Sequence, residues 1–221
     1  MSPLAVLLAL AGYLFGGVPF GVLLTRVKGV NLFQVGSGNI GATNVVRAVG
    51  FKWGLMTWLA DTLKGMTLVL VARLLGQPEA VWASTGIAAV VGHCFSPYLH
   101  LRGGKGIATS LGVLLAFDWR VGCIAFALWI VVMVGCRIVS VASLAAAVTL
   151  LPLVLFLHDT PTGIVLAGAL TSISVIRHKE NIERLLRGEE KPFGDKSRAE
   201  QEVGARAVSG METDDPPPPV A

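Results

Sequence analysis

The stretch RGGKGIATS at residues 102–110 places three glycines and a lysine where an apolar run begins. Backbone amides at the start of a helix attract anions, and the ammonium group of Lys105 adds a full positive charge. A nucleotide-binding P-loop would need Gly at position 99 and Ser or Thr after the lysine, but Leu99 and Gly106 stand there. The stretch therefore predicts a phosphate site without nucleotide hydrolysis. The alternative is a tight turn whose cations simply mark a cytoplasmic loop.

A second polar segment, GSGNIGATNVVRAVG at residues 36–50, mixes small residues with hydrogen-bonding ones. Small residues let the backbone approach a ligand closely. The neutral donors here are Ser37, Asn39, Thr43 and Asn44. If a helix begins near Asn39, Thr43 and Arg47 are neighbours on one helix face, one turn apart. This favours a wall that binds an anion, and the alternative is a glycine-rich helix cap with Arg47 among lipid headgroups.

A third polar segment, HKENIERLLRGEE, covers residues 178–190. On a helix, His178, Asn181 and Arg184 fall within an arc of about 120° and can line one wall. His178 stands among charged partners and is a candidate proton acceptor, since histidine titrates near neutral pH. The alternative is a solvated amphipathic helix that follows the last transmembrane span.

The elements that position these segments are apolar, because 53% of the 221 residues are hydrophobic and only 14% are charged. A soluble domain averages about 25% charged residues, so an all-α polytopic membrane protein is predicted. A membrane-spanning helix needs about 20 apolar residues. Seven runs are candidates, at residues 3–25, 51–75, 79–98, 107–117, 119–135, 138–157 and 161–176. The fourth run would reach only about 16 Å as a helix, so we expect a loop that dips into the protein to feed it.

The basic residues sort the connections between these runs into two classes. One class carries Arg26, Lys28, Arg47, Lys52, Arg102, Lys105, Arg137, Arg177, Lys179, Arg184 and Arg187, and the other carries only Arg73 and Arg120. By the positive-inside rule the first class is cytoplasmic, so seven spans place the N-terminus outside and the C-terminus inside. The three polar segments, together with Arg137, Ser140 and Ser143, then share the cytoplasmic face.

The remaining polar residues predict little chemistry. Asp61 and Lys64 are three residues apart within a span and are expected to pair, either structurally or toward the bundle interior. No HxxxH or HExxH spacing suggests zinc, so His93, His100 and His158 receive little weight. Nucleic-acid binding is not expected, because the net charge is only +4 and the basic residues are dispersed.

The three cysteines, Cys94, Cys123 and Cys136, show no CxxC spacing and are expected to be buried hydrophobic residues without disulfide or metal. Residues 1–190 are expected to form one membrane domain. The charged, proline-rich stretch at 191–221 is expected to be a disordered cytoplasmic tail.

The polar stretches together resemble one family closely, the acyl-phosphate:glycerol-3-phosphate acyltransferases of bacterial phospholipid synthesis, or PlsY family. The matching stretches are GSGNIGATNVVR, DTLKG, GHCFSPYLHLRGGKGIAT, RIVSVAS and HKENIERLLRGEE. They occur in the family's order and cover residues 1 to about 190.

This resemblance implies a seven-helix enzyme of the bacterial inner membrane whose site faces the cytoplasm. It implies transfer of a fatty acyl group from acyl phosphate to the 1-hydroxyl of glycerol 3-phosphate, which gives lysophosphatidic acid and phosphate. No cofactor or metal is implied, and acyl-CoA and acyl-carrier protein are not expected as donors. The lipid bilayer is the expected partner, and a monomer is compatible with the sequence.

The resemblance also assigns residues to the site. The catalytic candidates are His178, Ser37, Lys105 and Arg47. The substrate-binding candidates are Asn39, Gly41, Thr43, Asn44, Gly103, Gly104, Gly106, Thr109, Arg137, Ser140, Ser143, Asn181, Arg184 and Glu190. The loop at 103–106 is expected to hold the acyl-phosphate headgroup. The attacking hydroxyl would lose its proton to His178 or to a phosphate oxygen of the donor, and both routes stay open.

Two other classes of protein fit less well. A small transporter would typically show an inverted repeat and a site near the membrane midplane, whereas the polar motifs here gather at one membrane edge and no repeat is visible. Acyltransferases with a His-x4-Asp motif need Asp five residues after a histidine, but Glu183 follows His178 at that distance.

Overall fold

The computed structural model describes residues 2–194, which form helices joined by turns and loops without a strand. The helices are α1 (Pro3–Gly17), α2 (Phe20–Arg26), α3 (Ala42–Val49), α4 (Phe51–Leu74), α5 (Glu79–Cys94), α6 (Ile107–Phe117), α7 (Trp119–Cys136), α8 (Val139–Val148), α9 (Leu150–Leu157), α10 (Pro161–Arg177) and α11 (Lys179–Leu186). Short 3-10 turns occupy Leu32–Gln34 and Pro97–Leu99. Each of the seven apolar runs is largely helical, which confirms the all-α part of the prediction.

Four helical stretches among the described residues are long and apolar enough to cross a membrane. They are Pro3–Arg26, Phe51–Leu74, Trp119–Cys136 and Val139–Leu157. The other three apolar helices, α5, α6 and α10, have 16, 11 and 17 residues. The predicted tail at 191–221 lies almost wholly outside the described residues.

Two of the seven runs are interrupted: the sixth run is divided between α8 and α9, and the first between α1 and α2. Pro19 has no N–H to continue the first helix, so α1 ends before it and α2 begins after it. At this break the carbonyl of Val18 accepts hydrogen bonds from the Phe20 amide at 3.1 Å and from Lys64 Nζ at 2.8 Å. Lys64 also pairs with Asp61 Oδ1 at 2.7 Å, as predicted, and both side chains are buried. The ion pair of α4 therefore stabilises the break in the first helix.

Glycines let the helices approach one another closely. A Cβ atom on Gly92 of α5 would lie 2.0 Å from the carbonyl oxygen of Tyr13 in α1. One on Gly112 of α6 would lie 1.9 Å from the carbonyl oxygen of Thr62 in α4. In lipid no hydrophobic driving force holds helices together. Small residues at such crossings let the backbones approach closely, and van der Waals packing then stabilises the contact.

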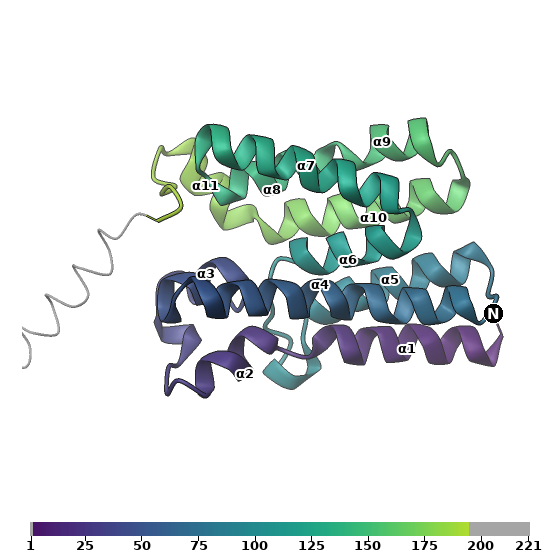
Figure 1. The fold of residues 1–221 in the computed structure, drawn as a ribbon, viewed down its shortest axis with the longest axis horizontal. Helices are drawn as coiled ribbons and strands as arrows, with labels where there is room; N and C mark the ends of the chain where they lie inside the picture. The colour runs from purple at the N-terminus through teal and green to yellow at the C-terminus, as the bar shows by residue number, and fades with distance from the viewer. Residues whose placement is uncertain (1, 195–221) are drawn as a thin grey trace, which may run out of the picture.

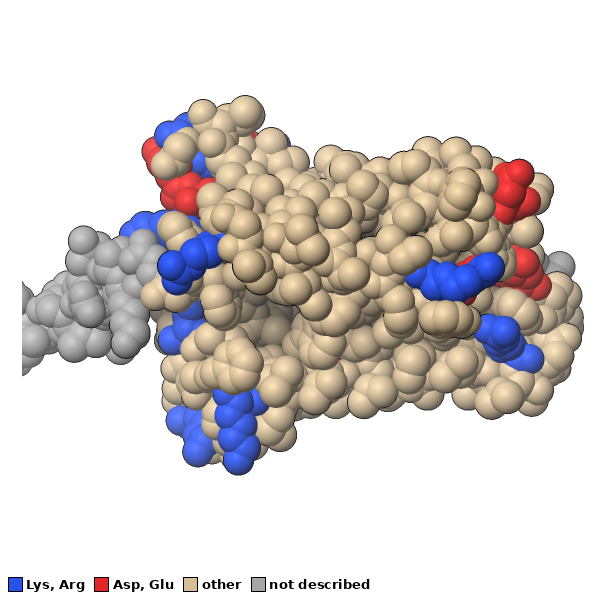
Figure 2. All heavy atoms as spheres, turned by 45° about the horizontal axis from the view of Figure 1, so that its top comes forward, with Lys and Arg blue, Asp and Glu red and all other residues tan. Residues whose placement is uncertain are grey.

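The helices form two groups that run along the same long axis (Figure 1). Helices α1, α4 and α5 lie on one side, α7, α8, α9 and α10 on the other, and α6 lies between them. Helices α2, α3 and α11 gather at the end opposite the N-terminus. Lys and Arg side chains cluster at that end and a smaller charged group at the other, with an uncharged band between (Figure 2).

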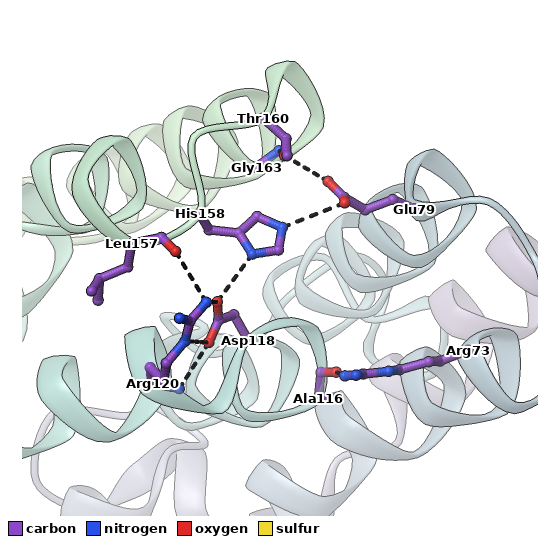
Figure 3. A network of polar contacts seen from close by, with 9 residues as sticks. All are labelled: Arg73, Glu79, Ala116, Asp118, Arg120, Leu157, His158, Thr160 and Gly163. Atoms are coloured by element: carbon purple, nitrogen blue, oxygen red, sulfur yellow. Dashed lines mark hydrogen bonds and ion pairs between the residues drawn. The ribbon is translucent and has the colours of Figure 1, made fainter.

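A polar cluster closes the end of the molecule near the N-terminus (Figure 3). His158 lies between two carboxylates, with Nδ1 3.0 Å from Asp118 Oδ2 and Nε2 3.4 Å from Glu79 Oε2. Hydrogen bonds from Arg120 hold the pKa of the Asp118 carboxyl down at about 2. Thr160 donates to Glu79 Oε1 at 2.7 Å. The cluster thus joins α5, the α6–α7 turn and the α9–α10 turn.

The prediction that all three cysteines are buried is wrong for two of them. Cys94 is buried in the core cluster, but Cys123 and Cys136 are exposed on α7. The reason is position, because α7 packs along the edge of the bundle and only a small part of it faces other helices. Its apolar surface is suited to lipid contact.

Candidate functional site

A cavity of about 500 Å³ opens between the two groups of helices. Its polar part is lined by the 35–47 loop and α3, by Lys105 and Gly106, and by the segments around Ser140, His178 and Glu190. Its apolar part is lined by α4, α6, α7, α8 and α9 through Trp58, Leu111, Leu114, Phe126, Trp129, Ala147 and Leu150. A charged ligand with an apolar tail fits this division.

Most of the predicted site residues line this one cavity. They are Ser37, Asn39, Gly41, Thr43, Asn44, Arg47, Lys105, Gly106, Ser140, Ser143, His178, Asn181, Arg184 and Glu190. The structure therefore brings the three polar segments of the sequence together, although more than 130 residues separate the first from the last.

Gly103 and Gly104 do not line the cavity, contrary to the prediction. They pack backward onto the end of α5, where a Cβ on Gly103 would lie 2.2 Å from the carbonyl oxygen of His93. A Cβ on Gly104 would lie 2.1 Å from Nε2 of the same histidine. Glycine is required at both positions because the loop packs against His93, and not because a ligand approaches the loop.

Thr109 and Arg137 also lie away from the cavity. Thr109 is fully buried against α4, where its carbonyl would lie 2.1 Å from a Cβ on Gly65, and Ser110 lines the cavity in its place. Arg137 is exposed at the end of α7 in a left-handed conformation, and its carbonyl accepts a hydrogen bond from the Phe193 amide. In the sequence, Arg137 is a basic residue on the side expected to be cytoplasmic, and this pattern does not distinguish a ligand contact from a surface charge.

Within the first polar segment, Asn44 organises the loop. Its Oδ1 accepts from the Ser37 amide at 3.0 Å, and its Nδ2 donates to the Val35 carbonyl at 3.0 Å. Asn39 accepts from the Gly41 amide at 2.9 Å in a local turn, so α3 begins at Ala42 and not near Asn39. Thr43 and Arg47 still fall one turn apart on α3, as predicted.

Glu190 joins the last polar segment to α8. Its Oε1 accepts from Ser140 at 2.7 Å and from Asn181 Nδ2 at 2.6 Å, and its Oε2 accepts from Arg184 Nε at 2.6 Å. Partial burial acts to raise the pKa of Glu190, but these three hydrogen bonds outweigh it and lower the pKa. The carboxylate stays ionised and fixes Asn181, whose Oδ1 accepts a hydrogen bond from Lys105.

Lys105 and His178 have shifted acid–base properties. Burial, supported by the charges of Arg184 and Arg47 and opposed by Glu190, lowers the pKa of Lys105 to about 8. Burial, followed by the charge of Lys105, lowers the pKa of His178 to about 4. His178 is therefore neutral at pH 7.

The tautomer of His178 follows from its partner. Its Nδ1 lies 2.7 Å from the Ser174 carbonyl, which can only accept a hydrogen bond, so Nδ1 carries the proton. Nε2 then keeps its lone pair. Since His178 lines the cavity, this nitrogen is available there as a proton acceptor.

An aromatic wall borders the apolar part of the cavity. The rings of Trp58 and Phe126 stack with centroids 5.5 Å apart, and those of Phe126 and Trp129 with centroids 6.3 Å apart. Trp129 Nε1 donates to Ser143 Oγ at 3.2 Å. The wall therefore links the apolar part of the cavity to one of its hydroxyl groups.

Sequence reasoning missed several polar residues at the cavity floor. Asp61, His93 and Ser110 line the cavity, and His93 Nδ1 lies 3.7 Å from Asp61 Oδ1. No local motif marks His93, because its place at the cavity results from packing against a loop that lies ten residues later in the chain. The glycine pair at 103–104 is the one sequence signal that something bulky must lie behind that loop.

This chain matches known proteins over most of its length. A family model described as glycerol-3-phosphate acyltransferase matches residues 6–188. A glycerol-3-phosphate acyltransferase of Rubrobacter xylanophilus is 45% identical over 195 residues, which are 88% of this chain and 98% of that protein. One from Aquifex aeolicus is 39% identical over 191 residues, with 86% and 99% covered.

Solved structures share the fold as well. The crystal structure of PlsY (YgiH), an integral membrane glycerol 3-phosphate acyltransferase, in its glycerol 3-phosphate form superposes with a TM-score of 0.83 at 38% identity. That match covers 86% of this chain and 96% of the other. The lysophosphatidic acid form gives 0.81 at 37% identity, with 86% and 95% covered. This chain therefore belongs to the glycerol-3-phosphate acyltransferase family.

Proposed function

We propose that this protein transfers a fatty acyl group from acyl phosphate to the 1-hydroxyl of glycerol 3-phosphate and releases lysophosphatidic acid and phosphate. The observation that carries the proposal is the lining of the cavity, which combines an apolar part with a basic, hydrogen-bonding part. The product that this reaction forms has the same division into an apolar chain and a phosphate.

The donor is assigned to the groove and to the loop beside it. Its acyl chain lies along the aromatic wall of Trp58, Phe126 and Trp129, within the apolar bundle. Its phosphate lies near Lys105 and Gly106 at the start of α6, where helix amides and the ammonium group favour an anion. Charge-assisted hydrogen bonds of this kind are the strong ones in a partly dry site.

The acceptor is assigned to the wall formed by the first and last polar segments. Arg47 and Arg184 supply guanidinium groups that suit a phosphate, and Ser37 and Ser143 supply hydroxyls. Asn181 is fixed between Lys105 and Glu190, so it joins the acceptor wall to the donor loop.

The chemistry requires positioning more than a covalent intermediate. Acyl phosphate is an activated mixed anhydride, so the 1-hydroxyl oxygen attacks the acyl carbonyl carbon directly while the carbon–oxygen bond to phosphate breaks. The hydroxyl proton passes to His178 Nε2 or to an oxygen of the departing phosphate. Orientation of the two substrates and charge stabilisation of the leaving phosphate by Lys105 supply the rate.

We place the site at the cytoplasmic side of the bacterial inner membrane. Support comes from the basic residues gathered at the end that holds α2, α3 and α11, because the positive-inside rule makes that end cytoplasmic. Seven crossings then include the shorter α5, α6 and α10, with the N-terminus outside and the C-terminus inside. One membrane domain within residues 1–190 is sufficient for the site, and a monomer would be active.

Purified protein in detergent provides the test. Phosphate release should require both acyl phosphate and glycerol 3-phosphate, and lysophosphatidic acid should appear in equal amount. Acyl-CoA should not replace the donor. If the reconstituted protein instead moved glycerol 3-phosphate into liposomes without forming lysophosphatidic acid, the transporter alternative would replace this proposal.

A further inference from the structure

Arg177, the last residue of α10, reaches from the acceptor side of the site to the donor loop. Its Nε donates to the Gly104 carbonyl at 3.0 Å, and its Nη2 donates to the Gly103 carbonyl at 2.9 Å. Its guanidinium also lies 5.3 Å from the centre of the Phe95 ring. Arg177 therefore fastens two consecutive peptide groups that are more than 70 residues away in the chain.

These two bonds fix how the loop presents its amides. A trans peptide is planar, and its C=O and N–H groups point in opposite directions. Because the Gly104 carbonyl turns toward Arg177, the Lys105 amide must turn away from Arg177. The Gly103 carbonyl turns the same way, and the amide of its peptide, on Gly104, donates to the His93 carbonyl at 3.1 Å.

Without Arg177 the peptide between Gly104 and Lys105 would lose this preference, while the Gly104 amide would keep its bond to the His93 carbonyl. Glycine adopts left-handed and right-handed backbone conformations about equally, so the peptide that follows Gly104 can flip easily. A flip would present a carbonyl oxygen where an amide stood. An anion that the amide attracts would then meet the negative end of the peptide dipole.

We propose that Arg177 is a positioning residue for the donor, which keeps the 103–106 loop in the orientation that binds the acyl-phosphate headgroup. This inference rests on the proposed function. Arg177 does not line the cavity, and its hydrogen bonds reach the site through the loop carbonyls.

The geometric effect falls on the donor loop, although Arg177 precedes His178 and its charge is a minor cause of the lowered pKa of His178. His178 is held by its own bond to the Ser174 carbonyl, and Asn181 is held by Glu190. Neither bond involves Arg177. The acceptor wall should therefore keep its geometry when the arginine is replaced.

The test compares Arg177→Met and Arg177→Lys with Arg187→Met. Arg187 is exposed one residue beyond α11, so its replacement removes the same charge from the same end of the molecule. We expect Arg177→Met to lower kcat/KM for acyl phosphate by about tenfold to a hundredfold, from the loss of two charge-assisted bonds. Arg177→Lys keeps the charge but cannot donate to both carbonyls as the planar guanidinium does, so it should show an intermediate loss of kcat/KM. The KM for glycerol 3-phosphate should change less than threefold in each variant.

Chemical rescue separates positioning from general folding. Guanidinium ion at millimolar concentration should restore part of the donor kcat/KM of an Arg177→Ala variant and none of that of Lys105→Ala. The inference is overturned if Arg177→Met behaves like Arg187→Met, if both KM values rise together, or if guanidinium restores nothing. Failure of the proposed function would show differently, because the unaltered protein would then not transfer the acyl group at all.

Discussion

At the scale of single residues, the site is defined by two groups whose charge states are set by burial. The pKa of His178 falls to about 4, so its imidazole is neutral and its Nε2 is free to accept a proton across the physiological range. The pKa of Lys105 falls to about 8, so its charge is present at pH 7 but is lost within reach of ordinary buffers.

Replacing His178 tests its role as a base. A His178→Gln variant keeps a hydrogen-bonding side chain of similar length but cannot accept a proton at neutral pH. We expect kcat to fall about a hundredfold or more if His178 is the base, while the KM for acyl phosphate changes little. Near-normal turnover in steady-state assays would assign the proton to the donor phosphate.

The pH dependence tests Lys105. Below its pKa of about 8 the ammonium is charged and attracts the donor phosphate, and above it the amine is neutral. We therefore expect kcat/KM for acyl phosphate to be flat near pH 7 and to fall about tenfold per pH unit well above 8. Arg stays protonated beyond pH 12, so in Lys105→Arg the decrease of kcat/KM should no longer appear in the pH range of the assay. The same limb in both proteins would show that another group titrates.

At the scale of elements, the site depends on how closely α6 packs on α4. Helix α6 has only 11 residues, and it is held where Gly112 touches the Thr62 carbonyl. The loop that leads into α6 carries Lys105 and Gly106 to the cavity. A shift of α6 would therefore move the donor loop.

A methyl group at this contact tests the packing. A Cβ on Gly112 would overlap a backbone oxygen, which cannot move aside as a side chain would. Overpacking typically costs about 1–3 kcal/mol, so Gly112→Ala should lower the unfolding temperature in detergent by roughly 5 °C or more. Gly168→Ala on α10 is the matched control, because nothing lies within 4 Å of its added Cβ. Equal unfolding temperatures in the two variants would refute the packing argument.

The sequence predicts the elements better than their contacts. Apolar runs locate all seven helical stretches to within a few residues, because lipid requires continuous apolar surface. The first run contains a break at Pro19, where the Val18 carbonyl accepts a hydrogen bond from Lys64 of a different helix, and no local pattern reveals that bond. Gly103 and Arg137 lie outside the cavity, which no motif reveals either, since a motif gives residue types and only the fold gives their direction.

At the scale of the whole molecule, charge divides the protein into two ends and an apolar band (Figure 2). The substrate cavity opens at the more basic end, near α3 and α11, and the His158 cluster closes the other (Figures 1 and 3). This polarity fits a lipid-tailed donor that reaches the site from the bilayer while its phosphate meets the basic end.

The orientation in the membrane is testable by labelling. In a protein whose three native cysteines are replaced, Asp159→Cys and Arg187→Cys each place one exposed thiol at opposite ends. We expect a membrane-impermeant maleimide to label position 159 on intact spheroplasts and position 187 only after the membrane is opened. The reverse pattern would invert the proposed topology.

The central claim is that both substrates occupy one cavity and react directly, without an acyl-enzyme intermediate. Initial rates measured while both acyl phosphate and glycerol 3-phosphate are varied test it most directly, with phosphate exchange as a second readout. We expect intersecting double-reciprocal lines, the pattern of a ternary complex, and no exchange of labelled phosphate into acyl phosphate when glycerol 3-phosphate is absent. Parallel lines together with such exchange are the fingerprint of a covalent intermediate and would contradict it.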